Sequence, residues 1–170
     1  MRLIGKQGNI ETYPIQQIKR VRLVKRADGY YVQFAVKTNR TLPHEPTGKQ
    51  VGMDVGLKEF STDSDGNTVE HPRSLRKAEA NLNRLHRRVS RKQKQSKNRK
   101  KAIKRLAKGY LQVSRRRKDF AVKAASALVK SSDFIAYEDL KIASLVKNHK
   151  LAKSINDASW RLFLSSRPLL

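Results

Sequence analysis

Cysteine is absent from this chain of 170 residues, and acidic side chains are few. Without cysteine the protein can form neither a disulfide nor a thiolate zinc site, which fits a reducing cytoplasm. The four histidines are scattered without metal-ligand spacing, so we interpret them as surface or structural residues. No run approaches the roughly 18 consecutive apolar residues of a membrane span, and the N-terminus lacks the apolar stretch of a secretory signal. We therefore expect a cytoplasmic protein that does not enter a membrane.

The charge balance is one-sided: 39 Lys and Arg oppose 14 Asp and Glu, giving a formal net charge of +25 and an isoelectric point near 10.9. Such a surface repels itself and attracts polyanions, of which nucleic acid is the commonest. An anionic membrane surface is another polyanion that could attract it. The composition therefore predicts a polyanion-binding protein, with enough chain for one domain and its core.

Two β-rich zones are predicted in the first 70 residues. In the first zone, alternating residues flank a turn signal at 27–29, which predicts a β-hairpin. Residues 42–48 contain two prolines and a glycine and are typical of a linker. The second zone predicts a meander of three short strands joined by tight turns, at about 52–56, 60–63 and 68–69.

Helical periodicity follows from about residue 73 to about residue 130. Apolar residues recur at spacings of three and four in two series, within 75–89 and within 103–127. Residues 90–101 contain no apolar side chain, so the chain is predicted to reverse there. Two helices with facing apolar stripes form an antiparallel helical hairpin.

The predicted helical hairpin is strongly basic, because residues 73–118 contain twenty Lys or Arg and one acid, Glu79. One interpretation is a solvated coiled-coil arm. The other is a nucleic-acid interface, since like charges at i,i+4 destabilise a helix by roughly a few tenths of a kcal/mol per pair and a polyanion would compensate for them. The candidate nucleic-acid-binding residues are Arg84, Arg87, Arg88, Arg91, Lys92, Lys94, Lys97, Arg99, Lys100, Lys101, Arg115, Arg116, Arg117 and Lys118.

Two carboxylates flank the helical hairpin on strand-like segments. Asp54 lies inside the first strand of the meander, and Glu138 follows a buried-strand pattern at 134–137. A strand that returns after a long helical crossover is usually parallel to its partner, which could bring the two carboxylates together. Such a pair suits Mg²⁺ or Mn²⁺, as in two-metal nucleases. Spacing alone leaves open that Asp54 is a turn or cap residue and that Glu138 simply ends a strand.

Seven ordered motifs carry a resemblance to a known family. They are GMDVGL (52–57), STDSDG (61–66), LHRRVSRK (85–92), SKNRKKA (96–102), RRKDF (116–120), YEDL (137–140) and KNHKLAKSI (147–155). With these motifs, roughly residues 17–163 closely resemble the OrfB/TnpB proteins of insertion sequences. That family was long labelled as transposases and is now understood as RNA-guided DNA nucleases related to type V CRISPR effectors.

The resemblance implies an α/β fold: a partial RNase H-like (RuvC) nuclease domain at 50–170, with the basic helical hairpin inserted at about 73–130. It implies that residues 1–41 are the C-terminal strands of a wedge-type β-barrel that handles guide RNA. Asp54 and Glu138 match the first two catalytic carboxylates and would hold Mg²⁺ or Mn²⁺. The implied partners are DNA and a guide-type RNA.

The chain also departs from the family. The resemblance implies further wedge and recognition regions before Met1, and a four-cysteine zinc element and a third catalytic Asp after this chain. The only acid beyond Asp139 is Asp157, which falls in a different family segment. We therefore expect a remnant truncated at both ends, without zinc, with weak or no metal binding, and with an exposed sheet edge where the fifth strand is missing.

Three functional interpretations follow from these observations. The chain could be a transposon-associated nuclease of the OrfB/TnpB family, and reproducible cutting would then mean that a partner chain or Asp157 supplies the missing carboxylate. It could instead be a remnant that binds nucleic acid without cutting it, which is the outcome we expect. A general basic RNA-binding or ribosomal-type protein would explain the charge and would leave Asp54 and Glu138 as coincidence.

Overall fold

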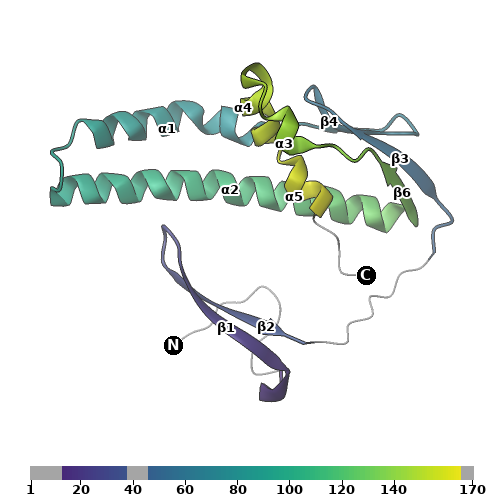
Figure 1. Ribbon diagram of the computed structural model, residues 1–170, viewed down its shortest axis with the longest axis horizontal. Coiled ribbons are helices and arrows are strands. Elements are labelled where there is room, and N and C mark those ends of the chain that lie inside the picture. The colour runs from purple at the N-terminus through teal and green to yellow at the C-terminus, as the bar shows by residue number, and fades with distance from the viewer. Residues whose placement is uncertain (1–12, 38–45, 166–170) are drawn as a thin grey trace. The chain divides into compact units, whose positions relative to one another are not determined.

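The structure, a computed structural model, describes residues 13–37 and 46–165. It shows a mixed α/β protein (Figure 1), and the chain divides into two compact units, residues 1–41 and 42–170. Part of the expected linker, residues 42–45, lies outside the described residues, and the part at 46–49 forms neither helix nor strand. None of the described helices is long and apolar enough to cross a membrane.

The first unit is a two-stranded antiparallel hairpin, as the turn signal predicted. A short 3-10 turn, Ile15–Gln17, leads into β1 (Ile18–Lys25), which pairs with β2 (Tyr30–Val36). The backbone N–H of Arg26 donates to the carbonyl of Gly29 at 2.8 Å and closes the turn between them. The assignment of this unit to a wedge-type barrel stays a prediction.

The second unit contains a four-stranded sheet in the order β5-β4-β3-β6. The meander prediction is confirmed, because β4 pairs antiparallel with both β3 and β5, while β6 lies parallel to β3 as the crossover argument predicted. The strands are β3 (Gln50–Val55), β4 (Glu59–Asp63), β5 (Thr68–Glu70) and β6 (Phe134–Tyr137). β6 therefore forms one edge of the described sheet.

The tight turn between β4 and β5 has a local cause. The carboxylate of Asp63 accepts hydrogen bonds from the backbone N–H of Asp65 (3.0 Å) and of Asn67 (2.8 Å). Gly66 adopts φ +83°, a left-handed conformation that glycine enters without steric cost. The sequence predicted this turn because Asp, Asn and Gly residues all favour turns.

Two long helices cross between β5 and β6. α1 (Ser74–Ser90) and α2 (Lys97–Ser131) lie antiparallel and side by side (Figure 1), joined by residues 91–96, which we call the elbow. The elbow ends in a capped helix start, because the Ser96 hydroxyl accepts from the Arg99 backbone N–H at 3.1 Å. Between the helices, His86 Nε2 and the Tyr110 hydroxyl are hydrogen bonded at 2.7 Å. The prediction of a helical hairpin that reverses within 90–101 is confirmed.

A glycine in α2 sets how closely the two helices approach. A Cβ atom at Gly109 would lie 3.1 Å from Leu82 Cδ2 and 3.3 Å from Leu85 Cδ1, tighter than ordinary van der Waals contact. Any larger side chain would meet both leucines of α1. Gly109 therefore marks a close approach of α2 to α1.

We expect Gly109→Leu to lower the free energy of unfolding by about 2 kcal/mol, the usual cost of overpacking a closely packed contact. The measurement is urea unfolding followed by circular dichroism. Lys108→Leu is the matched control, since Lys108 is exposed and the same side chain there should change stability by less than about 0.5 kcal/mol. Equal stabilities for the two variants would contradict the close approach at Gly109.

Three shorter helices, which the sequence analysis did not predict, follow β6. They are α3 (Ile142–Leu145), α4 (His149–Ala158) and α5 (Trp160–Ser165). The core lies between the sheet and the helices α2, α4 and α5. At its centre, the ring of fully buried Phe60 packs edge-to-face on Phe120 and Phe163, with centroids 4.8 and 5.1 Å away. The helices thus cover one face of the sheet.

Candidate functional site

The first candidate carboxylate lies on the sheet face opposite the core. Successive side chains of a strand point to opposite faces. On β3, Val51 and Met53 are buried and Met53 belongs to the core, whereas Asp54 between Met53 and Val55 is exposed. On β4, the residue paired with Asp54 is Thr62, which is also exposed. Asp54 therefore stands on an open, polar face of the sheet.

The second candidate carboxylate comes next to the first through the parallel pairing of β3 and β6. The register pairs Gly52 with Ala136 and Met53 with Tyr137. Extended by one residue, it places Glu138, directly after β6, opposite Asp54. Both residues are exposed. The pairing of β3 with β6 therefore puts the backbone of Glu138 one residue beyond the paired stretch, on the side of β3 that carries Asp54.

Asp133, which sequence reasoning missed as a positioning residue, fixes where these two strands begin. Its carboxylate accepts hydrogen bonds from the backbone N–H and hydroxyl of Thr47, both at 3.0 Å, and from the backbone N–H of Gly48 at 2.7 Å. In return, the Lys49 carbonyl accepts from the backbone N–H of Asp133 at 2.9 Å. These contacts hold the start of β3 beside the start of β6, and so support the register on which the carboxylate pair depends.

The donor set of this pair suits a hard cation. Carboxylate oxygens and waters are the ligands that Mg²⁺ and Mn²⁺ take, and the sequence offers no cysteine for a zinc site. Across residues 13–37 and 46–165, no three His, Asp or Glu side chains gather in a group that could hold a metal. The candidate site in this part of the chain is therefore a pair of carboxylates and not a triad.

Asp157, weighed above as a source of the missing carboxylate, is committed elsewhere. It is 5% exposed, and its two carboxylate oxygens accept from the backbone N–H groups of Leu75 (2.7 Å) and Arg76 (3.2 Å). These are the first N–H groups of α1, whose N-cap residue Arg73 offers no side-chain cap. Asp157 therefore caps α1 on the helical side of the sheet, and the suggestion that it completes the Asp54 site is corrected.

Arg117, counted among the candidate nucleic-acid-binding residues, also has a structural contact. Its side chain is partly buried, and Nε donates to the Ser159 hydroxyl at 2.6 Å. Burial lowers the pKa of Arg117, and the nearby Asp157 carboxylate partly offsets this shift. Arg117 thus ties α2 to the junction of α4 and α5.

His71 lies close to the same carboxylate and is 3% exposed. Its Nδ1 accepts from the backbone N–H of Arg73 at 3.0 Å. Burial lowers the pKa of His71, although Asp157 acts in the opposite direction. A histidine with a lowered folded pKa opposes folding once it must be protonated, so its contribution to stability is lost as the pH falls from about 6.5 through the folded pKa. The interpretation of this histidine as structural agrees with its burial.

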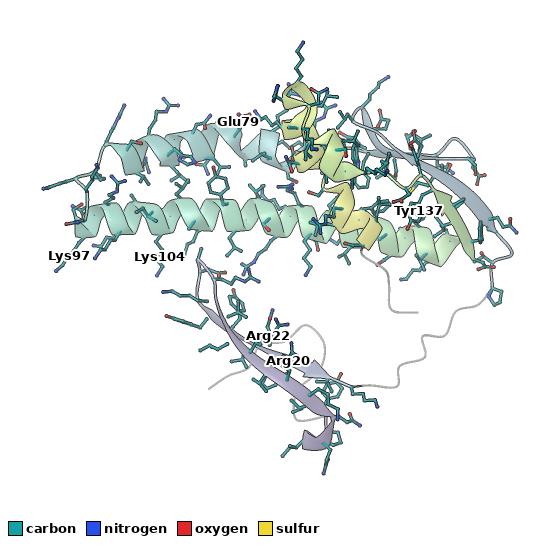
Figure 2. All side chains as sticks on the ribbon, viewed as in Figure 1. Arg20, Arg22, Glu79, Lys97, Lys104 and Tyr137 are labelled. Atoms are coloured by element: carbon teal, nitrogen blue, oxygen red, sulfur yellow. The ribbon has the colours of Figure 1, made fainter. Side chains whose placement is uncertain are left out.

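Most of the other candidate binding residues lie on the open surface of the helical hairpin. Among the fourteen, only Arg99 and Arg117 are partly buried, and the other twelve are exposed. Glu79, the single acid of the basic run, is held by Lys153 of α4, with the ammonium 2.6 and 2.7 Å from the two carboxylate oxygens. Figure 2 shows side chains projecting from both helices toward the elbow end, where Lys97 begins α2. Near the elbow, the surface therefore presents cations, and the one acid of residues 73–118, Glu79, is paired with Lys153 instead.

Comparison with known proteins identifies the family of this chain. The model of the OrfB_IS605 family, described as "Probable transposase", matches residues 33–149. The chain belongs to this family. The match covers β3 to β6 and the entire helical hairpin, which are the elements that carry the carboxylate pair and the basic surface.

Two curated relatives of this family are similar to the chain. A Streptomyces pristinaespiralis protein named "Putative RNA-guided DNA endonuclease" is 37% identical over 135 residues, 79% of this chain and 33% of its own length. The Escherichia coli K12 protein "Putative RNA-guided DNA endonuclease InsQ" is 29% identical over 131 residues, 77% of this chain and 33% of its own. The chain thus spans about a third of the length of the curated relatives it matches.

Proposed function

We propose that this chain is a transposon-encoded nucleic-acid-binding protein derived from an RNA-guided, metal-dependent DNA endonuclease. The helical hairpin binds DNA and a guide-type RNA through phosphates, and Asp54 with Glu138 forms the remaining part of a RuvC-like metal site. The chain acts in the cytoplasm, holds Mg²⁺ or Mn²⁺ weakly, uses no zinc, and does not cut nucleic acid by itself. The first unit is the end of a wedge-type domain that contacts the guide RNA.

The observation that carries this proposal is the parallel register of β3 and β6. Extended by one residue, this register sets Glu138 opposite Asp54, which supports a shared site, and the crossover between the two strands is the basic helical hairpin. A general basic RNA-binding protein needs the charge of the hairpin, but it does not need two acids at matching positions. The names of the two relatives support a DNA-cutting ancestor guided by RNA.

When bound, Mg²⁺ or Mn²⁺ would activate a water for attack on a phosphodiester and stabilise the leaving oxygen. The chain's own contribution is to hold one carboxylate on β3 and the other directly after the adjacent β6, and to bring the polyanion against the helical hairpin. Two-metal hydrolysis requires ligands in register, and a misplacement of about 1 Å can cost about 10²-fold in rate. With two carboxylates and Asp157 engaged in capping α1, both ions cannot be held in the alignment that cutting requires.

We expect the purified chain to bind Mn²⁺ weakly, through Asp54 and Glu138, and to leave plasmid and single-stranded DNA uncut in Mg²⁺ or Mn²⁺. Free Mn²⁺ can be measured by electron paramagnetic resonance, and cutting by gel electrophoresis. The double variant Asp54→Asn with Glu138→Gln should weaken Mn²⁺ binding at least about tenfold, because two carboxylates are its protein ligands.

Glu70→Gln is the matched control for the metal measurement, since Glu70 is an exposed acid on β5 of the same sheet. Equal Mn²⁺ binding by the control and the double variant would remove the metal pair from the proposal. Reproducible cutting that disappears in Asp54→Ala would show that the chain, alone or with a partner, completes an active site.

A further inference from the structure

The two helices border a half-open hollow of about 510 Å³ beside the elbow. One wall comes from the end of α1 and the elbow, through Leu85, Arg88 and Lys92. Leu85 and Arg88 are three residues apart on α1 and so share one helical face, and Lys92 follows in the elbow. The facing wall comes from the first turns of α2. We call this feature the elbow hollow.

The second wall repeats the same arrangement of charge. It consists of Asn98, Lys101, Ala102 and Arg105, again spaced by three and four. Lys101 and Arg105 form a like-charge i,i+4 pair near the start of α2, where a helix dipole disfavours cations. The first turn of α2 contains no acid. The native sequence therefore concentrates positive charge at a place where it destabilises the free helix.

No carboxylate lines the elbow hollow, although four cations do. An anion bound in the hollow would attract these cations and so offset the repulsion between them. The lining, however, also includes the apolar side chains of Leu85 and Ala102, which a bare phosphate does not need. Asn98 adds an amide that can both donate and accept hydrogen bonds. The lining combines apolar surface, an amide and cations, and a nucleotide presents the matching three features: a flat base, its polar edge and its phosphates.

We propose that the elbow hollow holds one unpaired nucleotide of a bound nucleic acid. The base packs against Leu85 and Ala102 with its edge at Asn98, and the flanking phosphates lie on the cations of the two walls. This inference rests on the proposed nucleic-acid binding and names the feature that the helical hairpin recognises. A regular duplex keeps its bases paired inside and offers only phosphates, so it leaves the hollow unfilled.

The test compares two labelled hairpin duplexes that differ by one extrahelical nucleotide, 2-aminopurine, each made in DNA and in RNA. Fluorescence anisotropy with the full chain should give about tenfold tighter binding to the bulged duplex, because the unpaired base would bury apolar surface against Leu85 and Ala102. The 2-aminopurine emission should also change on binding. A preference in either DNA or RNA supports the hollow as a nucleotide site.

The decisive variant, Ala102→Leu, extends a bulkier side chain into the hollow, where the base would pack, without changing charge. It should abolish the preference for the bulge and the emission change while leaving affinity for the regular duplex within about twofold. Ala80→Leu, which places the same side chain at an exposed position of α1, should keep the preference. Helical content measured by circular dichroism checks that both variants fold.

A second pair of variants distinguishes the effect of the cations that line the hollow from the effect of net charge alone. Lys101→Gln with Arg105→Gln should weaken binding of the bulged duplex more than Lys104→Gln with Lys108→Gln, although both remove two charges. Lys104 and Lys108 are exposed and do not line the hollow, and Figure 2 shows Lys104 on the side of α2 away from α1.

Two results would overturn the inference in distinguishable ways. Tight binding of both duplexes without any bulge preference, unchanged in Ala102→Leu, would refute the nucleotide site and leave the proposed phosphate binding standing. No binding of any duplex at low salt would refute both the site and the nucleic-acid-binding function on which it rests.

Discussion

A quadruple glutamine variant at the elbow end of α1 is expected to bind duplex DNA at least about a hundredfold more weakly than the native chain near 0.1 M salt. The replaced residues are Arg87, Arg88, Arg91 and Lys92, all exposed. Each phosphate contact releases counterions and contributes about −0.9 to the slope of log affinity against log salt. Losing four contacts should therefore reduce the magnitude of that slope by roughly 3 to 4.

The matched control removes four exposed cations of the same unit that lie outside the elbow and outside α1. In this control Lys130, Lys141, Lys147 and Lys150 are replaced by glutamine. Both variants lower the net charge by the same amount, so a general charge effect would weaken both equally. An unchanged salt slope in the elbow variant would show that this part of the helical hairpin is a solvated face. Titrations at several salt concentrations distinguish these outcomes.

Asp157→Ala is expected to lower the free energy of unfolding by about 3 kcal/mol, measured by urea denaturation. The buried carboxylate accepts two N–H groups at the start of α1 and attracts the partly buried guanidinium of Arg117. Alanine would leave the two partly buried N–H groups without their acceptor and the Arg117 guanidinium without its nearby anion. Removing one partner of a buried charged group is among the most costly single substitutions.

Two further substitutions make this stability prediction specific. Asp157→Asn keeps the shape and one acceptor oxygen, so it should cost about half as much as alanine. Asp139→Ala removes an exposed acid and should stay within about 0.5 kcal/mol of the native chain. Similar stabilities for Asp157→Ala and Asp139→Ala would show that the cap contributes little to holding α1 in place.

The elements that sequence reasoning predicted are those with local causes. Turn signals at 27–29 and at Gly66 specify the two β-turns, and apolar spacing specifies α1 and α2. The short helices α3, α4 and α5 were not predicted, because helices of this length depend on tertiary packing more than on propensity. The contacts of Asp133 and Asp157 connect residues more than 80 positions apart, and no local pattern reveals them.

In the candidate site, the pairing of the strands was predictable from the sequence, but the structural role of Arg117 was not recognised. Parallel pairing of the strands that carry Asp54 and Glu138 followed from the crossover rule, and the structure has that pairing. Arg117 was grouped with its basic neighbours, although four consecutive cations in a helix turn through the whole circumference and one must face inward. A signal was present in the sequence: Val113, Arg117 and Ala121 are spaced by four, and both apolar members are buried.

During synthesis, α1 emerges from the ribosome before Asp157, the residue that caps it. The hydrogen bond from Leu75 joins residues 82 positions apart. At synthesis rates of roughly 5–20 residues per second, this separation corresponds to a delay of about 4–16 s. The basic helices therefore leave the ribosome before the residue that caps the first of them. For several seconds the nascent chain is a polycation with an unsatisfied helix start, surrounded by ribosomal and messenger RNA.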